Sequence, residues 1–285
     1  MGRPITFLSD YGYADEFAGV CRAVIARIAP ESPVIDLTHG VAPRGVLGGA
    51  LMLADALPHA PAGVHLAVVD PGVGSERRAI AVRVADEDRV LVGPDNGLLS
   101  PALEALGGAV EAVDLAASSF RLEPVSATFH GRDLFAPVAA RLAGGATLAE
   151  AGESLAPDSL ARLELPLARV EADRVVAEVL HLDRFGNATL SVRSEQLEGG
   201  PLRLGQALAI EIAGSPSAAT FARTFAEVPE GAALVYEDSS RRLALAVNAG
   251  SAAEALGLRA GDEVVLRPSD AGVERSGRSP RVRGD

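Results

Sequence analysis

The most informative chemical grouping in this sequence is a turn that joins an aspartate to two adjacent arginines. Asp70 follows the apolar run 64–69, which is typical of a buried parallel strand. Because open α/β sheets bind ligands at the carboxyl ends of their strands, Asp70 is expected at such an edge. A proline and two glycines within 71–74 predict a tight turn, with Arg77 and Arg78 close behind it. Such a pair suits chemistry on a polar reactant, and it can equally be a salt bridge that pins a loop.

Three further segments carry polar or ionisable side chains that could take part in binding or catalysis. Asp10 follows an apolar strand, His130 lies between an aromatic residue and a glycine, and the segment 183–187 opens a strand and turn in the second half. Each has an ordinary structural explanation. Asp10 can cap a helix, His130 can be a packed or capping histidine, and 183–187 can be simple turn chemistry. Taken singly, these residues leave the choice open.

Apolar strands and helices alternate along the first half of the chain, and these elements must position the residues above. The helix over 15–29 has apolar residues at helical spacing and ends before Pro30. This alternation predicts an α/β domain, in which helices cover a mostly parallel sheet. The expected strands are 5–8, 34–37, 64–69, 80–84 and 89–92, and the expected helices are 15–29 and 46–57.

The second half has a different pattern, in which short strands are separated by turns and helical periodicity is scarce. The change follows a loosened stretch at 155–168 and predicts a small all-β domain of the barrel or sandwich type. The polar tail lacks apolar anchors and is expected to be disordered. We therefore expect an α/β domain over 1–160, a β-barrel-like domain over 161–268 and a tail over 269–285, with later strands at 174–182, 188–192, 206–212, 232–236, 242–247 and 263–266 and a short helix near 251–257.

Composition argues against several classes of partner. The 285 residues carry a formal net charge of −12, no lysine and no basic stripe that would bind nucleic acid. No apolar run reaches the roughly 18–20 residues of a spanning helix, and the first residues pass directly into a strand, so we expect neither a membrane partner nor a signal peptide. The single cysteine, Cys21, excludes an internal disulfide and fits a reducing cytoplasm, with a buried apolar environment expected for its side chain.

The sequence also lacks the signatures of several catalytic mechanisms. Without lysine no Schiff base can form, and no serine elbow, dinucleotide fingerprint or phosphate-binding loop is found. The histidines are dispersed and form no chelating pair. We therefore expect neither a bound metal nor a cofactor. The five histidines are His39, His59, His65, His130 and His181.

Taken in order, the chemical segments resemble the motifs of the S-adenosyl-L-methionine (SAM) hydroxide adenosyltransferases. These proteins are SAM hydrolases related to the fluorinases and chlorinases. The resemblance extends over residues 4–266. It rests on Ser9-Asp10-x-Gly12, Val69-Asp70-Pro71-Gly72-Val73-Gly74, Pro94-Asp95-Asn96-Gly97-Leu98-Leu99, Thr128-Phe129-His130-Gly131-Arg132, Asp183-x-Phe185-Gly186-Asn187 and Leu243-Ala-Leu-Ala-Val-Asn248.

This resemblance implies a fold, an assembly and a reaction. Members of the family join an α/β N-terminal domain to a β-barrel C-terminal domain, and they assemble as homotrimers. Their substrate lies between the N-terminal domain of one subunit and the C-terminal domain of its neighbour. The implied reaction is hydrolysis of SAM to adenosine and L-methionine, in which water or hydroxide attacks C5′ of the ribose.

Carried over by position, the resemblance implies three catalytic residues, Asp70, Arg77 and His130. Whether His130 takes the proton of the water, or only positions a hydroxide that Arg77 stabilises, stays open. The implied substrate-binding residues are Asp10 for the ribose hydroxyls, Asn187 and Ala249 for the adenine edge, Phe185 and Phe225 for packing against the base, and Asp15, Asp183 and Ser239 for the methionine amine and carboxylate.

The related halogenases differ from this chain at the positions that would hold the nucleophile. They carry tyrosines where Asp70 and His130 stand, and the fluorinase also has hydroxyl residues in place of Val73 and Gly131. This chain instead has groups that can hold and polarise water, which favours hydrolysis. The alternative functions are a SAM-dependent halide adenosyltransferase and a non-catalytic protein that binds adenosine or SAM.

Other positions leave the assignment of single residues ambiguous. Arg78 lies beside Arg77, so the active guanidinium could be either one. Ser240 lies beside Ser239, and we prefer Ser239 because it aligns without a gap to the downstream motif. Val247 replaces an arginine that the fluorinase has.

Overall fold

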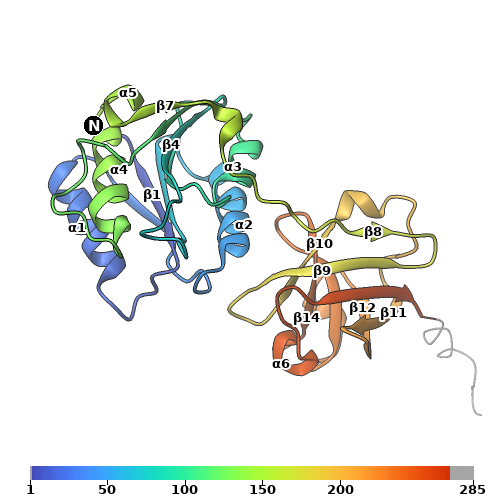
Figure 1. Ribbon diagram of the computed structural model, residues 1–285. Helices are drawn as coiled ribbons and strands as arrows, with labels where there is room; N and C mark the ends of the chain where they lie inside the picture. Colours follow the sequence, from blue (N-terminus) through green and yellow to red (C-terminus); the bar gives the residue numbers. More distant parts are fainter. Residues whose placement is uncertain (1, 270–285) are drawn as a thin grey trace, which may run out of the picture. The chain divides into compact units, whose positions relative to one another are not determined.

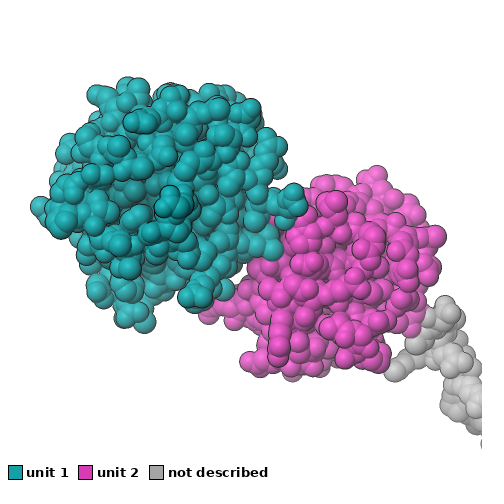
Figure 2. All heavy atoms as spheres, in the orientation of Figure 1, with its two compact units in different colours: residues 1–164 teal, residues 165–285 magenta. Residues whose placement is uncertain are grey.

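The computed structural model describes residues 2–269, which form two compact units divided between residues 164 and 165 (Figure 2). The first unit is a layered α/β structure and the second is almost all β, which confirms the expected fold class. The expected tail falls outside the described residues from residue 270 onward, while the amide of Ser269 donates to the carbonyl oxygen of Ala207 at 2.9 Å. Among the described residues, no helix is long and apolar enough to cross a membrane.

The first unit is built on a seven-stranded sheet in which most strands share one direction. Strands β2, β1, β3 and β5 are parallel neighbours, and β6 has the same direction because the antiparallel β4 separates it from β5. In order across the sheet, the strands are β2 (Val34–Thr38), β1 (Ile5–Ser9), β3 (Val64–Val68), β5 (Val90–Pro94), β4 (Ala79–Val84), β6 (Ala109–Asp114) and β7 (Glu153–Leu155).

Helices cover both faces of this sheet, with α1 and α4 on one side and α2 and α3 on the other (Figure 1). The neighbouring residues Phe7 and Leu8 of β1 enter opposite cores, because successive side chains of a strand point to opposite faces. Burial of each such side chain contributes about 1.5–3 kcal/mol. The helical segments are α1 (Phe17–Ile28), α2 (Val46–Ala56), η1 (Leu57–His59), α3 (Ser100–Ala105), the π-helical turn η2 (Gly131–Phe135), α4 (Ala136–Ala143), α5 (Leu148–Ala151) and η3 (Pro157–Ser159).

The strand pairing brings the chemical residues to one edge of the sheet. Ser9 pairs with Val68, so the segments that follow β1 and β3 leave the sheet side by side. Because β4 is antiparallel to β5, with Ala79 paired to Pro94, the residues that precede β4 reach the same edge. The aspartates after β1 and β3 and the arginines before β4 therefore share this edge, although they are distant in sequence.

The second unit is a closed barrel of seven strands with an eighth strand attached. The strands pair in the order β10–β14–β13–β12–β11–β15–β9, and β9 pairs with β10 to close the ring, while β8 pairs with β9. Alternate residues of β9, Val175, Ala177 and Val179, enter the barrel core. The elements are β8 (Arg169–Val170), β9 (Val175–Leu182), β10 (Ala188–Arg193), η4 (Ser194–Leu197), β11 (Ala207–Ile212), β12 (Ser215–Phe221), η5 (Phe225–Glu227), β13 (Ala233–Glu237), β14 (Arg242–Val247), α6 (Ala252–Leu256) and β15 (Glu263–Pro268).

Candidate active site

Asp70, Arg77 and His130 form one connected cluster in the first unit, named the trio below. The Nε of Arg77 donates to both carboxylate oxygens of Asp70, at 2.9 and 3.0 Å, and its Nη2 forms an ion pair with the same carboxylate. That Nη2 also lies 2.9 Å from Nδ1 of His130. The side chains of Asp70 and Arg77 are only 6% and 10% exposed, so water screens this ion pair weakly.

The turn after β3 directs the side chain of Arg77 toward the other two residues of the trio. The hydroxyl of Ser75 accepts the amide of Arg77 at 3.3 Å, which closes the turn behind the guanidinium. Gly74 has a φ of +78°, and a Cβ there would lie 2.5 Å from the carbonyl oxygen of Ala127. The turn therefore packs directly on the segment that leads to His130. Only glycine fits this combination of backbone angle and close approach.

His130 immediately precedes the π-helical turn η2, an irregularity that is frequent at functional sites. A guanidinium can only donate, so the contact with Arg77 makes Nδ1 of His130 the acceptor, and the neutral ring then carries its proton on Nε2. Burial and the charge of Arg77 lower the pKa of His130 below its ordinary value of 6.5, against the opposing effect of Asp70 and Asp133. His130 is therefore a neutral hydrogen-bond donor at neutral pH.

Arg78 has a different partner from its neighbour in the sequence. Its Nε donates to Asp95 at 2.8 Å, and its Nη1 donates to the hydroxyl of Ser159 at 3.2 Å. This pair ties the sheet edge to η3 near the end of the first unit. Of the two adjacent arginines, Arg77 is thus the one that contacts the carboxylate and the imidazole of the trio.

Asp10 and Asp15 lie on the loop between β1 and α1. Asp10 is half-buried, and its Oδ2 accepts the amide of Arg44 at 3.0 Å. Its Oδ1 has no hydrogen-bond partner among residues 2–269. The loop begins beside a buried contact, in which the hydroxyl of Ser9 lies 2.7 Å from Nδ1 of His39. Asp15 is exposed at the far end of the loop, away from this anchored start.

A pocket of about 620 Å³ opens beside the trio. Arg77 and His130 line it, together with charged side chains of neighbouring loops that include Glu76, Arg121 and Glu123. Two of the three residues of the trio are therefore accessible to a small molecule from this side.

A second pocket, of about 650 Å³, lies in the barrel unit. Phe185 is 64% exposed there, so one aromatic face is free to stack on a flat ligand. The lining includes five residues that the sequence analysis assigned to the substrate, Asp183, Phe185, Asn187, Phe225 and Ala249, and four that it did not, Tyr236, Val247, Gly250 and Ser251.

Asp183 orders the turn that presents Phe185 and Asn187 to this pocket. Its Oδ1 accepts the amides of Phe185 and Asn187 at 2.8 and 2.9 Å, and its Oδ2 accepts from Nδ2 of Asn187 at 2.8 Å. Both carboxylate oxygens therefore serve the turn. The side-chain oxygen of Asn187 has no hydrogen-bond partner within the described part of the chain.

Comparison with known proteins identifies the family. Residues 5–152 match the N-terminal domain of the SAM hydroxide adenosyltransferases, and residues 177–265 match their C-terminal domain. The chain belongs to the SAM hydroxide adenosyltransferase family. This confirms the resemblance inferred from the motifs.

Several relatives of this adenosyltransferase family member are similar over nearly their full length. The chain is 50% identical to an (R)-S-adenosyl-L-methionine hydrolase of Salinispora tropica, over 91% of this chain and 96% of the relative. Its identity to the hydrolase of Thermus thermophilus is 42%, over 93% and 99%. A fluorinase of Nocardia brasiliensis is 30% identical, over 93% and 97%. The crystal structure of an uncharacterized conserved protein from Thermotoga maritima matches with a TM-score of 0.84 at 35% identity, over 92% and 99%.

One residue that the resemblance assigns to methionine lies outside the barrel pocket of this family member, and one residue of the pocket was not expected. Ser239 is exposed and is not among the residues that line the pocket, and the amide of Ser240 donates to Asp238 at 2.8 Å. Tyr236 lines the pocket and was not expected. Burial and the carboxylates of Asp183 and Asp238 raise the pKa of Tyr236 to about 12, so its hydroxyl stays protonated. The alternation of side chains along β13 is the signal that could have identified it.

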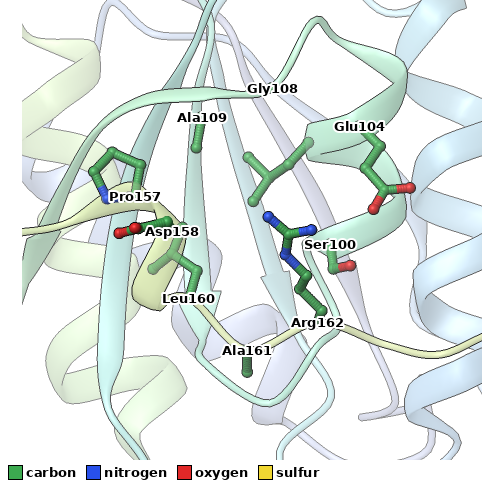
Figure 3. A pocket seen from close by; sticks show the side chains of 10 residues that line it. Ser100, Glu104, Gly108, Ala109, Pro157, Asp158, Leu160, Ala161 and Arg162 are labelled. Carbon is green, nitrogen blue, oxygen red and sulfur yellow. The ribbon is translucent and has the colours of Figure 1, made fainter.

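The first unit has a further pocket, of about 340 Å³, between α3 and the segment 157–162 (Figure 3). The side chain of Arg162 extends into its middle, between Glu104 and Asp158 (Figure 3). The pocket contains neither the trio nor any residue predicted to bind the substrate. It is therefore separate from the candidate active site.

The described residues offer neither a metal centre nor a reactive thiol. Between residues 2 and 269, no group of three or more His, Cys, Asp and Glu side chains is placed to hold a metal ion. Cys21 is buried, as expected, and burial raises the pKa of its thiol to about 12. This thiol is therefore protonated and packed rather than nucleophilic.

Proposed function

We propose that this protein hydrolyses SAM to adenosine and L-methionine. Its identity of 33–50% to four (R)-S-adenosyl-L-methionine hydrolases supports this reaction over halide transfer, since the fluorinases are 27–30% identical. Water or hydroxide attacks C5′ of the ribose, the C5′–S bond breaks, and methionine leaves as a neutral thioether. The leaving group needs no general acid because the sulfonium is already cationic.

The geometry of the trio is the observation that carries this proposal. A water that attacks carbon must be oriented so that one lone pair faces C5′ while its hydrogens face an acceptor. Asp70 is a charged acceptor with a largely buried side chain. Arg77 holds its carboxylate through hydrogen bonds from Nε and an ion pair from Nη2. Fixing the nucleophile in line with the bond that breaks is itself a large source of rate acceleration.

The hydrogen bond between Arg77 and His130 favours a positioning function for the imidazole. With Nδ1 occupied as an acceptor, the neutral ring offers only the N–H at Nε2 to a neighbour. It has no free lone pair with which to take a proton from water. The geometry therefore supports the mechanism in which Arg77 stabilises a bound hydroxide and His130 positions it, with Asp70 as the acceptor.

The remaining candidate residues suit the other parts of SAM. Asp10 has one carboxylate oxygen available for the ribose hydroxyls. In the barrel pocket, the amide of Asn187 and the exposed face of Phe185 together suit adenine, which has both a hydrogen-bonding edge and a flat surface. No step of this reaction requires a cofactor. The other proposed contacts are Phe225 and Ala249 for the base and Asp15, Asp183 and Ser239 for methionine.

We also propose that the protein acts in the cytoplasm as a homotrimer whose subunits share each site. The trio belongs to the first unit and the pocket around Asn187 belongs to the second. Each unit thus offers groups for one part of SAM. The family resemblance implies a substrate between the first domain of one subunit and the second domain of its neighbour, and this chain has candidate residues for both halves of such a site.

Product analysis in isotopically labelled water tests the reaction. The purified protein is incubated with SAM, and label is expected in the 5′-hydroxyl of adenosine, because the oxygen of the water ends on C5′. Asp70→Asn is the matched control, since it keeps the shape but not the charge, and turnover is expected to fall about 100-fold or more. A 5′-halo product in a parallel incubation with chloride or fluoride would contradict hydrolysis. Binding of SAM without turnover would instead indicate a sensor.

A further inference from the structure

The phenol of Tyr11 reaches the backbone that follows His130. A Cβ built on Gly131 would lie 2.0 Å from the hydroxyl oxygen of Tyr11 and 3.0 Å from its Cζ. Atoms do not approach so closely, so this phenol occupies the space that a side chain at residue 131 would fill. Tyr11 comes from the loop after β1, so its hydroxyl reaches the residue after His130 from a different element.

The ring of Tyr11 is held in place by three other aromatic side chains. The centroids of Phe7, Phe17 and Phe129 lie 6.4, 6.0 and 5.8 Å from its own, and the Phe7 and Phe129 rings meet it edge to face. Such contacts restrict both rotation and tilt of the phenol. The position of its hydroxyl beside Gly131 is therefore a fixed feature of the fold.

The hydroxyl of Tyr11 is a polar group without a partner in the described structure. It makes no hydrogen bond with any of residues 2–269. Burial raises the pKa of the phenol well above its ordinary value, with Cys21, Asp10 and Asp70 adding to the rise and Arg77 opposing it. The group therefore stays an O–H in the electric field of the trio. Tyr11 is half-buried, and a hydroxyl without a protein partner can hydrogen-bond a water or a ligand.

We propose that Tyr11 is a further catalytic residue, whose hydroxyl hydrogen-bonds the hydroxide that attacks SAM. This inference rests on the proposed hydrolysis. The hydroxide donates its one hydrogen to Asp70 and accepts the O–H of Tyr11, which leaves a lone pair directed at C5′. Its oxygen bonds to C5′ as the C5′–S bond breaks, so the products are adenosine and neutral methionine. Partners from two different loops define the orientation of the hydroxide, which a single partner would leave free to rotate.

A double-mutant cycle tests the contact itself. Gly131→Ala is expected to lower the thermal unfolding midpoint in the wild-type background, because its Cβ meets the hydroxyl oxygen. In the Tyr11→Phe background the same substitution is expected to cost less, since the nearest remaining ring atoms lie 3.0 and 3.2 Å away. Equal losses in both backgrounds would show that the phenol does not occupy this space and would overturn the proposal.

Steady-state kinetics test the catalytic function. Tyr11→Phe is expected to lower kcat about 10- to 100-fold, with KM and the thermal midpoint nearly unchanged, because one hydrogen bond to the attacking hydroxide is lost. Tyr13→Phe is the matched control, since Tyr13 is 71% exposed and its hydroxyl lies outside the trio. It is expected to retain wild-type kcat.

The two proposals fail in different ways in this assay. A wild-type protein that forms adenosine, combined with a Tyr11→Phe variant within twofold of wild-type kcat, would overturn the function of Tyr11 and leave hydrolysis intact. A loss in Tyr11→Phe confined to KM or to stability would also overturn it. A wild-type protein that forms no adenosine would overturn both.

Discussion

At the scale of single residues, one hydrogen bond determines how the imidazole of the trio can act. Arg77 donates to Nδ1 of His130, and the same guanidinium disfavours a second proton on the ring. The neutral imidazole and the adjacent cation are therefore compatible, whereas an imidazolium would face Arg77 with like charge. Protonation of His130 should then disrupt the trio.

This leads to a prediction on the pH dependence of activity. The lowered pKa of His130 means that the active neutral form persists below pH 6.5 and is lost only as the pH falls through the lowered value. The acid limb of kcat/KM should therefore have its midpoint below 6.5, since this profile reports ionisation of the free enzyme. Steady-state rates across the acid range provide the measurement, with His59→Asn as a control that retains the limb. A midpoint at or above 6.5 would contradict the assigned environment.

The contacts of single residues could be predicted from the sequence only in part. The identities of Asp70, Arg77 and His130 followed from motifs, but the choice between Arg77 and Arg78 did not. Adjacent residues at the start of a strand point to opposite sides, and which side faces His130 depends on the packing of two loops distant in sequence. The contact between Tyr11 and Gly131 escaped the sequence analysis for the same reason.

At the scale of elements, apolar periodicity determined which strands could be predicted. All five residues of β3 are buried, and its apolar run was recognised. β12 was missed, because it begins Ser-Pro, continues with small residues and has a single buried residue, Ala219. It forms a strand because β11 pairs with it from Ala207 opposite Thr220 to Ile212 opposite Ser215. A hairpin partner, rather than its own pattern, makes this segment a strand.

A second prediction concerns the turn that packs against the approach to His130. Gly74→Ala should destabilise the first unit by about 2–4 kcal/mol, because a positive φ and a clash with Ala127 combine. Gly108→Ala is the control in the same unit, since its φ is +92° but a Cβ would meet nothing within 4 Å. Its loss should be about 1 kcal/mol, from backbone strain alone. Denaturant unfolding measures both, and equal losses would contradict the proposed packing.

At the scale of the whole molecule, the change from α/β to β patterning was visible in the sequence, and the fold class followed from it. The closure of the barrel between β9 and β10 was not determined by local pattern, since barrels and sandwiches have similar strands. The candidate residues also fall on two different units, one with the trio and one with the pocket around Asn187. A shared site has a consequence that can be measured.

Subunit complementation tests the proposed sharing. Asp70→Ala impairs the first unit and Asn187→Ala impairs the second, and each variant alone should be nearly inactive. Trimers reassembled from an equal mixture should recover about one quarter of wild-type activity, because half the first units and half the second units are intact and pair at random. A mixture of Asp70→Ala with His130→Ala should recover nothing, since both changes affect the same unit. No recovery in the first mixture would place each complete site within one subunit.

The proposed adenine contact of Asn187 has a consequence for which nucleobase the barrel pocket would accept. Because one amide hydrogen of Asn187 is already committed to Asp183, the amide cannot flip, and it meets a ligand with its oxygen and its second hydrogen in a set order. That order matches a 6-aminopurine, whose exocyclic amine donates and whose ring nitrogen accepts. A 6-oxopurine would turn a carbonyl oxygen toward the amide oxygen, so deaminated analogues of the substrate should be rejected before any chemistry begins.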